Sequence, residues 1–171
     1  RHRVQSAIPQ FSDGYLSTIE EAIRFAPQIA IMANPSTFHV CIAQELAQLG
    51  SHLLIEKPLS TSLEGVENLI KTCKEHNSVL VVGYNLRYSP SLQRFQELLG
   101  EGMTGELLSI RCEAGQYLPS WRPLSDYRQG VSAKKELGGG ALLELSHEID
   151  YLRWICIVFN AFNVATRSPN N

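Results

Sequence analysis

Residues 28–57 read QIAIMANPSTFHVCIAQELAQLGSHLLIEK, and this stretch decides the fold of the first half of the chain. A compact apolar run at 28–33 meets an Asn-Pro-Ser-Thr turn, which ends a strand and caps a helix. The next apolar residues recur at helical spacing until Gly50, a typical end for a helix. A second apolar run, at 52–55, leads to Glu56 and Lys57. We therefore expect a strand, a helix and a strand in that order.

The same alternation continues on both sides of this stretch. Residues 17–25 have helical character, with either Ser17 or Thr18 as the N-cap. Residues 62–76 predict a further amphipathic helix, and residues 78–82 predict a third apolar strand. Short apolar strands that alternate with amphipathic helices are typical of a parallel sheet with right-handed crossovers. The first half of the chain is therefore predicted to be an α/β unit with a parallel sheet.

The pattern changes near Tyr84, which predicts a domain boundary between 1–84 and 85–171. We expect a helix at 91–99, a longer alternating strand at 105–116 and a loop at 117–137 that is rich in proline, aromatic residues and arginine. A last helix follows three glycines at 138–140. Its predicted apolar side contains Leu142, Leu143, Leu145, Ile149, Leu152 and Ile155.

Composition narrows the class of protein. The chain has 171 residues, of which 44% are hydrophobic, and a formal net charge of −2 with basic and acidic residues interspersed, so we expect neither nucleic acid nor a membrane surface as a partner. No apolar run approaches the length of a membrane span. The four cysteines, which we predict to be reduced core residues, are Cys41, Cys73, Cys112 and Cys156. They indicate a reducing, cytoplasmic compartment, and no histidine has the paired spacing of a metal site.

Several segments can then be compared with a known family: residues 31–35 with His39, Glu56-Lys57-Pro58, residues 83–88, and Gly138-Gly139-Gly140 with His147 and Asp150. Over residues 27–154 the chain resembles the Gfo/Idh/MocA family of NAD(P)-dependent oxidoreductases. The resemblance implies the C-terminal part of a dinucleotide-binding Rossmann domain at 1–84, followed at 85–171 by part of an α/β domain with a mostly antiparallel sheet.

The resemblance also implies that the chain is a fragment. The family's glycine-rich phosphate loop and its ribose-reading residue are expected before Arg1, so NAD cannot be told from NADP. Gly138-Gly139-Gly140 is not that loop, because it follows a loop rather than a strand.

Lys57 is the first candidate site residue. It follows a buried strand at its carboxyl end, where ligands bind in open α/β sheets, and Pro58 fixes the backbone after it. The resemblance implies that this lysine contacts the nicotinamide ribose and the substrate hydroxyl. Desolvation and a positively charged nicotinamide would disfavour its charged form, so it can donate a hydrogen bond or move a proton. The alternative is an ordinary surface lysine.

His147 is the second candidate; a lone histidine on a helix is usually structural, whereas the resemblance implies that this one is the general base. It would remove the hydroxyl proton while hydride leaves the same carbon for the nicotinamide. The family has an aspartate four residues before this histidine, whereas Glu144 lies three before it. Either spacing shares a helix face, so Glu144 can replace that aspartate or be a capping or surface carboxylate. Asp150 keeps the family spacing and would hold the imidazole or bind substrate.

The remaining predicted site residues come from the strand ends and the aromatic loop. The predicted cofactor-binding residues are Ala33, Asn34, Pro35, His39, Glu56, Lys57, Pro58 and Asn85, and the predicted substrate-binding residues are Arg87, Tyr117, Trp121 and Asp150. Asn34 and Pro35 also suit a plain helix-capping turn. Arg87 equally suits a domain-interface salt bridge. The aromatic loop, which also contains Arg122, Asp126 and Tyr127, suits a carbohydrate-binding wall, a packing lid or an oligomer contact.

The resemblance therefore implies a dehydrogenase that uses NAD or NADP to oxidise a secondary alcohol of a sugar, cyclitol or sugar derivative, as a homo-oligomer when full length. A non-catalytic sugar or dinucleotide sensor is the alternative, although a sensor has no need of Lys57 and His147 together. For residues 1–171 alone we expect weak or absent cofactor binding and no activity, because the loop that holds the pyrophosphate is not among them.

Overall fold

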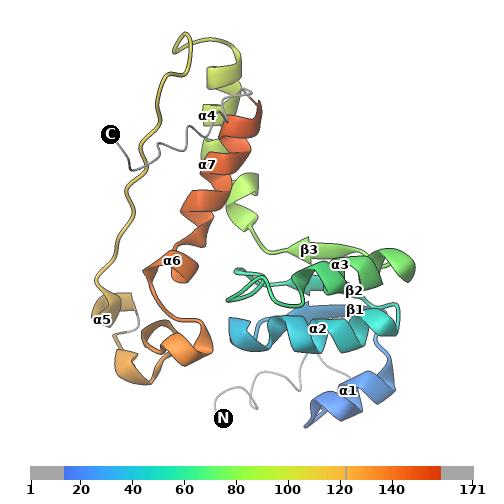
Figure 1. Cartoon of the computed structure of the whole chain (residues 1–171). Helices are drawn as coiled ribbons and strands as arrows, with labels where there is room; N and C mark the ends of the chain where they lie inside the picture. The colour runs from blue at the N-terminus through green and yellow to red at the C-terminus, as the bar shows by residue number, and fades with distance from the viewer. Residues whose placement is uncertain (1–13, 122, 159–171) are drawn as a thin grey trace, which may run out of the picture.

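A parallel sheet of three strands organises the first half of the chain in the computed structural model, which describes residues 14–121 and 123–158. The strands are β1 (Ile29–Met32), β2 (His52–Ile55) and β3 (Leu80–Val82), in the order β1-β2-β3. Both pairings are parallel. The predicted strands and the predicted parallel α/β unit are confirmed, and the three carboxyl ends meet at one edge of the sheet (Figure 1).

Two crossover helices cover one face of this sheet. They are α2 (His39–Gln48), which follows the short 3-10 helix η2 (Ser36–Phe38), and α3 (Val66–Glu75). Successive side chains of a strand point to opposite faces, so Leu53 and Ile55 face the helices while Leu54 faces away. The buried core between sheet and helices consists of Met32, Ala43, Leu46, Ala47, Leu53, Ile55, Leu69 and Cys73.

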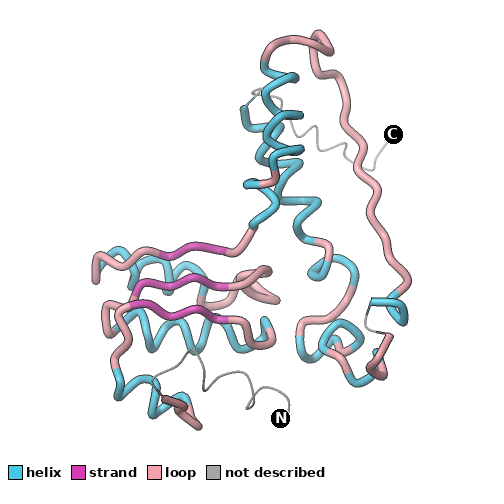
Figure 2. The backbone as a smooth tube through the Cα atoms, turned by 180° about the vertical axis from the view of Figure 1, so that it is seen from behind, coloured by secondary structure: helices cyan, strands magenta, loops and turns pink. Residues whose placement is uncertain are grey.

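The opposite face of the sheet is apolar and open. Its side chains include Ile29 and Ile31, which are 66% and 70% exposed, and Val81, which is 45% exposed. Figure 2 shows the three strands from this side with no helix of the described residues across them. Parallel sheets are normally covered on both faces. The described residues therefore form one covered face and one open face of such a sheet.

Two of the predicted helices are present but begin later in the sequence than expected. The helix expected at 17–25 is α1 (Ile19–Phe25), and Thr18 is its N-cap, because the Thr18 hydroxyl accepts a hydrogen bond from the Glu21 amide at 3.2 Å. The helix expected from residue 62 begins instead at Val66 in α3. Gly65 precedes it with a φ of +74°, which is the left-handed region and lies outside a helix.

The second half of the chain consists of short helical elements. They are η3 (Asn85–Tyr88), α4 (Pro90–Gly100), α5 (Leu118–Trp121), η4 (Tyr127–Gln129), η5 (Val131–Ala133), η6 (Lys135–Leu137), α6 (Ala141–Glu144) and α7 (Ser146–Val158). The helix expected at 91–99 is α4. The region 117–137, expected to be a loop, contains four of these short elements, because local backbone hydrogen bonds close successive turns within it.

The strand predicted at 105–116 is wrong for the described structure. These residues run extended along one side of the second half (Figure 1), but none of the described residues pairs with them. Alternating polarity favours an extended chain, whereas a strand also needs a neighbouring backbone for its hydrogen-bond ladder. Leu108 is accordingly 86% exposed. The mostly antiparallel sheet therefore stays a prediction.

The helix predicted after the three glycines is interrupted. Leu145, with φ −99° and ψ 27°, separates α6 from α7, so the predicted single helix is wrong. The predicted apolar side is also wrong in part, because the break turns two members outward: Leu142 is 70% exposed and Ile149 is 53% exposed. Ile155, by contrast, is buried as expected.

The cysteines and the chain as a whole complete the description. All four cysteines are free, but only Cys73 is a buried core residue. Cys41 is exposed, because it lies on the outward side of α2, and Cys112 and Cys156 are half-buried. Within residues 14–121 and 123–158, no helix is long and apolar enough to cross a membrane. Three parts of the sequence lie outside the described residues: residues 1–13 of the predicted first domain, Arg122, and residues 159–171 of the predicted second domain.

Candidate active site

Lys57 joins the edge of the sheet to the second half of the chain. It lies two residues after β2 and is half-buried, and its Nζ donates a hydrogen bond of 2.5 Å to the main-chain carbonyl of Glu144. Glu144 is the last residue of α6, and carbonyls at a helix end lack partners within the helix. The break at Leu145 thus exposes a carbonyl that the ammonium can use. It is this carbonyl of Glu144, not its carboxylate, that meets Lys57.

His147 follows on the first turn of α7 and is half-buried. Its ring lies edge-on to the ring of Tyr84, with the centroids 5.7 Å apart and the planes at 81°. Its Nδ1 is buried and has no hydrogen-bond partner. Burial lowers the pKa of His147, and the positive charge of Lys57 lowers it further, against the smaller opposite effects of nearby carboxylates. At neutral pH the imidazole is therefore neutral and able to accept a proton.

Tyr84 was not among the predicted site residues. In the sequence it marked a domain boundary and, within residues 83–88, contributed to the family resemblance. It follows β3 by two residues at the same edge of the sheet as Lys57, and this position is the signal that could have identified it. Its ring contact places His147 against the sheet edge.

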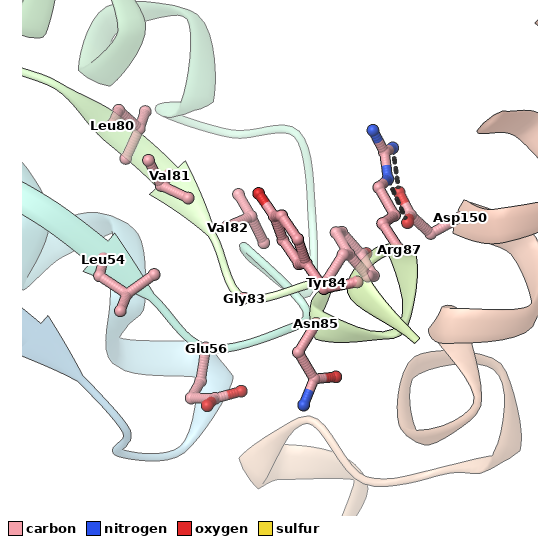
Figure 3. Close-up of a pocket in the computed structure, with 11 residues that line it drawn as sticks. Leu54, Glu56, Leu80, Val81, Val82, Gly83, Tyr84, Asn85, Arg87 and Asp150 are labelled. Carbon is pink, nitrogen blue, oxygen red and sulfur yellow. Dashed lines mark hydrogen bonds and ion pairs between the residues drawn. The ribbon is translucent and has the colours of Figure 1, made fainter. Parts of the chain in front are cut away.

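Arg87 and Asp150 form an ion pair within the second half, between η3 and α7. Arg87 Nε donates to Asp150 Oδ2 at 2.7 Å, and Nη2 donates to Oδ1 at 2.5 Å (Figure 3). The side chain of Asp150 is 11% exposed and that of Arg87 is 42% exposed. The hydrogen bonds to Asp150 raise the pKa of Arg87. Both carboxylate oxygens of Asp150 are engaged by Arg87, so Arg87 forms a salt bridge, within residues 85–171 rather than between the predicted domains, and Asp150 holds Arg87 rather than the imidazole.

A cavity of about 610 Å³ opens beside this pair at the carboxyl ends of β2 and β3. Its polar lining includes Glu56 and Asn85, whose side chains point to the same side of the sheet in Figure 3. Glu56 also accepts a hydrogen bond of 3.3 Å from the Lys57 amide through Oε2. This is the edge at which open α/β sheets bind ligands. The predicted positions of Glu56, Asn85 and Arg87 therefore share one cavity.

His39 has a different place from the one expected of a cofactor ligand. It is 1% exposed, and its ring nitrogens lie 3.0 Å from the Pro58 carbonyl oxygen and 2.9 Å from the Asn34 carbonyl oxygen. No ring nitrogen remains for a bound molecule. His39 instead ties the turn after β1, in which Ala33 is exposed and Pro35 half-buried, to the turn after Lys57. The Lys57–Pro58 peptide bond is cis.

The aromatic loop lies apart from Lys57 and His147. Trp121 and Tyr127 line a separate hollow of about 280 Å³, and Tyr117 is 75% exposed. Asp126 accepts hydrogen bonds from the Arg128 guanidinium at the surface, with Nε at 2.9 Å. The structure therefore does not bring this loop into the cavity at the sheet edge.

A glycine pattern that resembles a phosphate loop occurs at Gly100, Gly102 and Gly105, spaced as Gly-x-Gly-x-x-Gly. It follows α4 and leads into the extended residues, whereas a phosphate loop connects a strand to a helix. Gly102 and Gly105 both have positive φ and form the turns that end α4. This pattern therefore does not form a dinucleotide-binding loop.

The fold and the site together define an α/β protein with a Rossmann-type sheet, a lysine at the sheet edge and a neutral histidine beside it. A model described as an oxidoreductase family with an NAD-binding Rossmann fold matches residues 3–84, and a Gfo/Idh/MocA C-terminal domain model matches residues 92–166. The chain belongs to the Gfo/Idh/MocA oxidoreductase family.

Individual relatives agree with this assignment. The chain is 31% identical over 129 residues to an uncharacterised oxidoreductase of Synechocystis, with 75% of this chain and 34% of that protein aligned. It is 33% identical over 138 residues to levoglucosan dehydrogenase of Pseudarthrobacter phenanthrenivorans, with 77% and 34% aligned. The WlbA dehydrogenase of Bordetella pertussis, solved with NADH and UDP-GlcNAcA, superposes with a TM-score of 0.68 at 25% identity over 88% of this chain and 43% of that one. The chain spans about a third of the length of the curated relatives it matches.

Proposed function

We propose that the full-length protein uses NAD or NADP to oxidise a secondary alcohol of a sugar, cyclitol or sugar derivative. The observation that carries the proposal is the place of His147, half-buried on the helical segment that Lys57 holds at the sheet edge, where burial and the charge of Lys57 lower its pKa. A neutral histidine is suited to accept a proton from a hydroxyl group.

Lys57 would act on the oxygen of the same hydroxyl group. An ammonium has three N–H donors, and the Glu144 carbonyl accepts one of them. The other two donors can stabilise negative charge as it develops on the substrate oxygen. His147 would take the proton while Lys57 orients that oxygen. Glu144 contributes through its carbonyl, so we assign its carboxylate no step.

The residues at the sheet edge fit the nicotinamide end of a dinucleotide. This end would be held by residues at the carboxyl ends of the strands: Asn34 and Pro35 in the turn after β1, Glu56, and Asn85 after β3. Asn85 is exposed. Bound there, the nicotinamide would supply the hydride acceptor. His39 would act indirectly, by holding the two turns together.

Two similar proteins support a sugar-like substrate. One relative is named for its action on levoglucosan, and the WlbA structure was solved with a nucleotide sugar. The cavity beside β3 offers hydrogen-bonding groups on Glu56, Asn85 and the Arg87–Asp150 pair, while the rest of its lining is largely apolar and includes neither Lys57 nor His147. We also propose a homo-oligomer in the cytoplasm, where the four free cysteines would remain reduced.

The test is a purified full-length protein, assayed by nicotinamide absorbance with NAD and with NADP against a panel of sugars and polyols. We expect reduction of at least one dinucleotide by at least one member of the panel. Dinucleotide binding in calorimetry, without an absorbance change across the panel, would contradict the enzyme and support the sensor.

A further inference from the structure

Residues 138–140 form a turn of three consecutive glycines, called the glycine turn, and each position requires glycine for a different structural reason. A Cβ on Gly139 would lie 2.3 Å from the Val131 carbonyl oxygen, within its own loop. Gly140 has a φ of +118° and open space around it. Gly138 has a φ of +87°, and its Cβ would lie 2.0 Å from Oγ of Ser36, in the first half of the chain. Gly138 is therefore the member of the turn that faces the other half.

Ser36 and Thr61 form the surface on which Gly138 lies. Ser36 is 7% exposed and begins η2, directly after the Asn34-Pro35 turn. Thr61 follows Lys57 by four residues, and its Cγ2 would be 2.9 Å from a Cβ on Gly138. The contact between η6 and η2 brings these segments together, and in Figure 1 the orange turns before α6 approach the start of α2. Gly138 thus contacts the turns after β1 and β2 at once.

The short helix α6 is then held at both ends. Gly138 precedes it and contacts Ser36, and Glu144 ends it and accepts the Lys57 hydrogen bond. His147 lies only three residues beyond Glu144. Because α6 is a single turn between these two contacts, a displacement of Gly138 is expected to reach Glu144.

We propose that Gly138 is a positioning residue of the candidate active site: its lack of a side chain lets the glycine turn lie directly on Ser36 and Thr61, and this contact sets the position of α6, and with it His147, relative to Lys57. The role deepens the proposed function and depends on it for its kinetic consequence.

A methyl group at Gly138 has little room. Cβ contacts below 3.0 Å essentially never occur, so the turn would have to move by about 1 Å from Ser36 Oγ. The Thr61 methyl group at 2.9 Å is only just below that limit, so Ser36 Oγ is the group that restricts the turn. A displacement of this size between catalytic groups lowers a rate by up to about 100-fold.

The experiment compares Gly138→Ala with Gly102→Ala in the full chain. Gly102 has a similar φ of +76° and nothing within 4 Å of a Cβ, so it reports the backbone strain alone, far from the site. We expect Gly138→Ala to lower kcat about 10- to 100-fold with a smaller change in KM, and Gly102→Ala to leave both unchanged. By NMR, the pKa of His147 should rise in Gly138→Ala, because the ring moves away from Lys57 and becomes more solvated.

A second variant separates the steric contact from a general loss of stability. Ser36→Ala removes Oγ and leaves the Ser36 Cβ at an ordinary distance of 3.4 Å from the added methyl group. Ser36→Ala combined with Gly138→Ala should therefore recover at least tenfold of the lost kcat and return the His147 titration toward that of the parent. If Gly138→Ala does not fold, Ser36→Val enlarges the other side of the contact without strain at Gly138 and should give the same two changes.

The two readouts keep this inference distinct from the proposed function. A parent protein with no dehydrogenase activity would contradict the proposed function, while the His147 titration would still test the contact. The positioning role is overturned if Gly138→Ala matches Gly102→Ala in the titration. It is also overturned if adding Ser36→Ala to Gly138→Ala restores neither kcat nor the His147 pKa, since the loss would then come from the backbone of Gly138 alone.

Discussion

Two basic side chains near the joint between the two halves, Lys57 and Arg87, bind partners in the last helical segments, and they differ in what they leave free. Arg87 and Asp150 form a bidentate ion pair in which both carboxylate oxygens are engaged. Lys57 instead meets a neutral main-chain carbonyl, that of Glu144, through one of its three N–H donors. The first link is complete in itself and structural. The second keeps charge and donors available beside His147.

The largest expected effect comes from His147, the group that this second link holds in place. His147→Asn keeps a polar side chain of similar size but removes the proton acceptor, so we expect kcat of the full-length enzyme to fall about 10²- to 10⁴-fold. Dinucleotide affinity, measured by calorimetry, should stay within a few-fold of the parent. An equal fall for both would indicate damage to the fold rather than to the chemistry.

Lys57 should give the next largest effect. Lys57→Met keeps the length of the side chain and removes the donors, and we expect kcat/KM to fall about 100- to 1000-fold. Lys57→Arg should restore little activity, because a planar guanidinium does not reproduce the compact ammonium between Glu144 and a substrate oxygen. Full activity in Lys57→Met, measured with the best substrate of the panel, would make this link as purely structural as the Arg87 pair.

Arg87 should affect stability more than rate. Arg87→Ala leaves the largely buried Asp150 carboxylate without its partner, and we expect the free energy of unfolding to fall by about 1–2 kcal/mol, a value reduced because the guanidinium is partly exposed to solvent. kcat should change less than tenfold. Arg128→Ala, which breaks the surface pair with Asp126, is the matched control and should leave the denaturant midpoint unchanged. Equal effects of the two variants would remove the distinction between a buried and a surface pair.

The smallest expected effect is on stability as a function of pH. The pKa of folded His147 is lowered, so the unfolded chain binds a proton at a higher pH than the folded one. The stabilisation that follows is present above the ordinary histidine pKa of about 6.5 and is lost as pH falls through the lowered folded value. His147→Asn should therefore flatten the stability profile in this acid range, as measured by denaturant unfolding at several pH values. An unchanged profile would show that other groups govern it.

The sheet could be predicted because its signals are local. Apolar runs end at a turn or at Lys57, and Gly50 ends the helix between them, so the strand positions follow from neighbouring residues alone. The residues at 105–116 show the limit of that reasoning. Their alternation was correct as far as it indicates an extended chain, but a strand depends on a partner that sequence periodicity cannot supply.

The candidate site was predictable only in part, namely where its residues follow a strand end or match a family motif. Lys57 and His147 were found from a strand end and a family resemblance, and the structure brings the segments that carry them together. Tyr84 and the Gly138–Ser36 contact were not found, because each depends on residues far apart in the sequence. His39 was placed among cofactor ligands, whereas its burial and its two carbonyl partners became visible only once β1 and β2 lay side by side.

Lys57 and His147 interact electrostatically across the joint between the two halves, and the proposed chemistry depends on this interaction. The most direct test is the NMR titration of the His147 ring in the parent and in Lys57→Met. We predict a lowered pKa in the parent, and a pKa that rises in Lys57→Met because the positive charge is removed. The acid limb of kcat/KM should move to higher pH by the same amount. A His147 pKa that does not move when Lys57 is replaced would contradict the account.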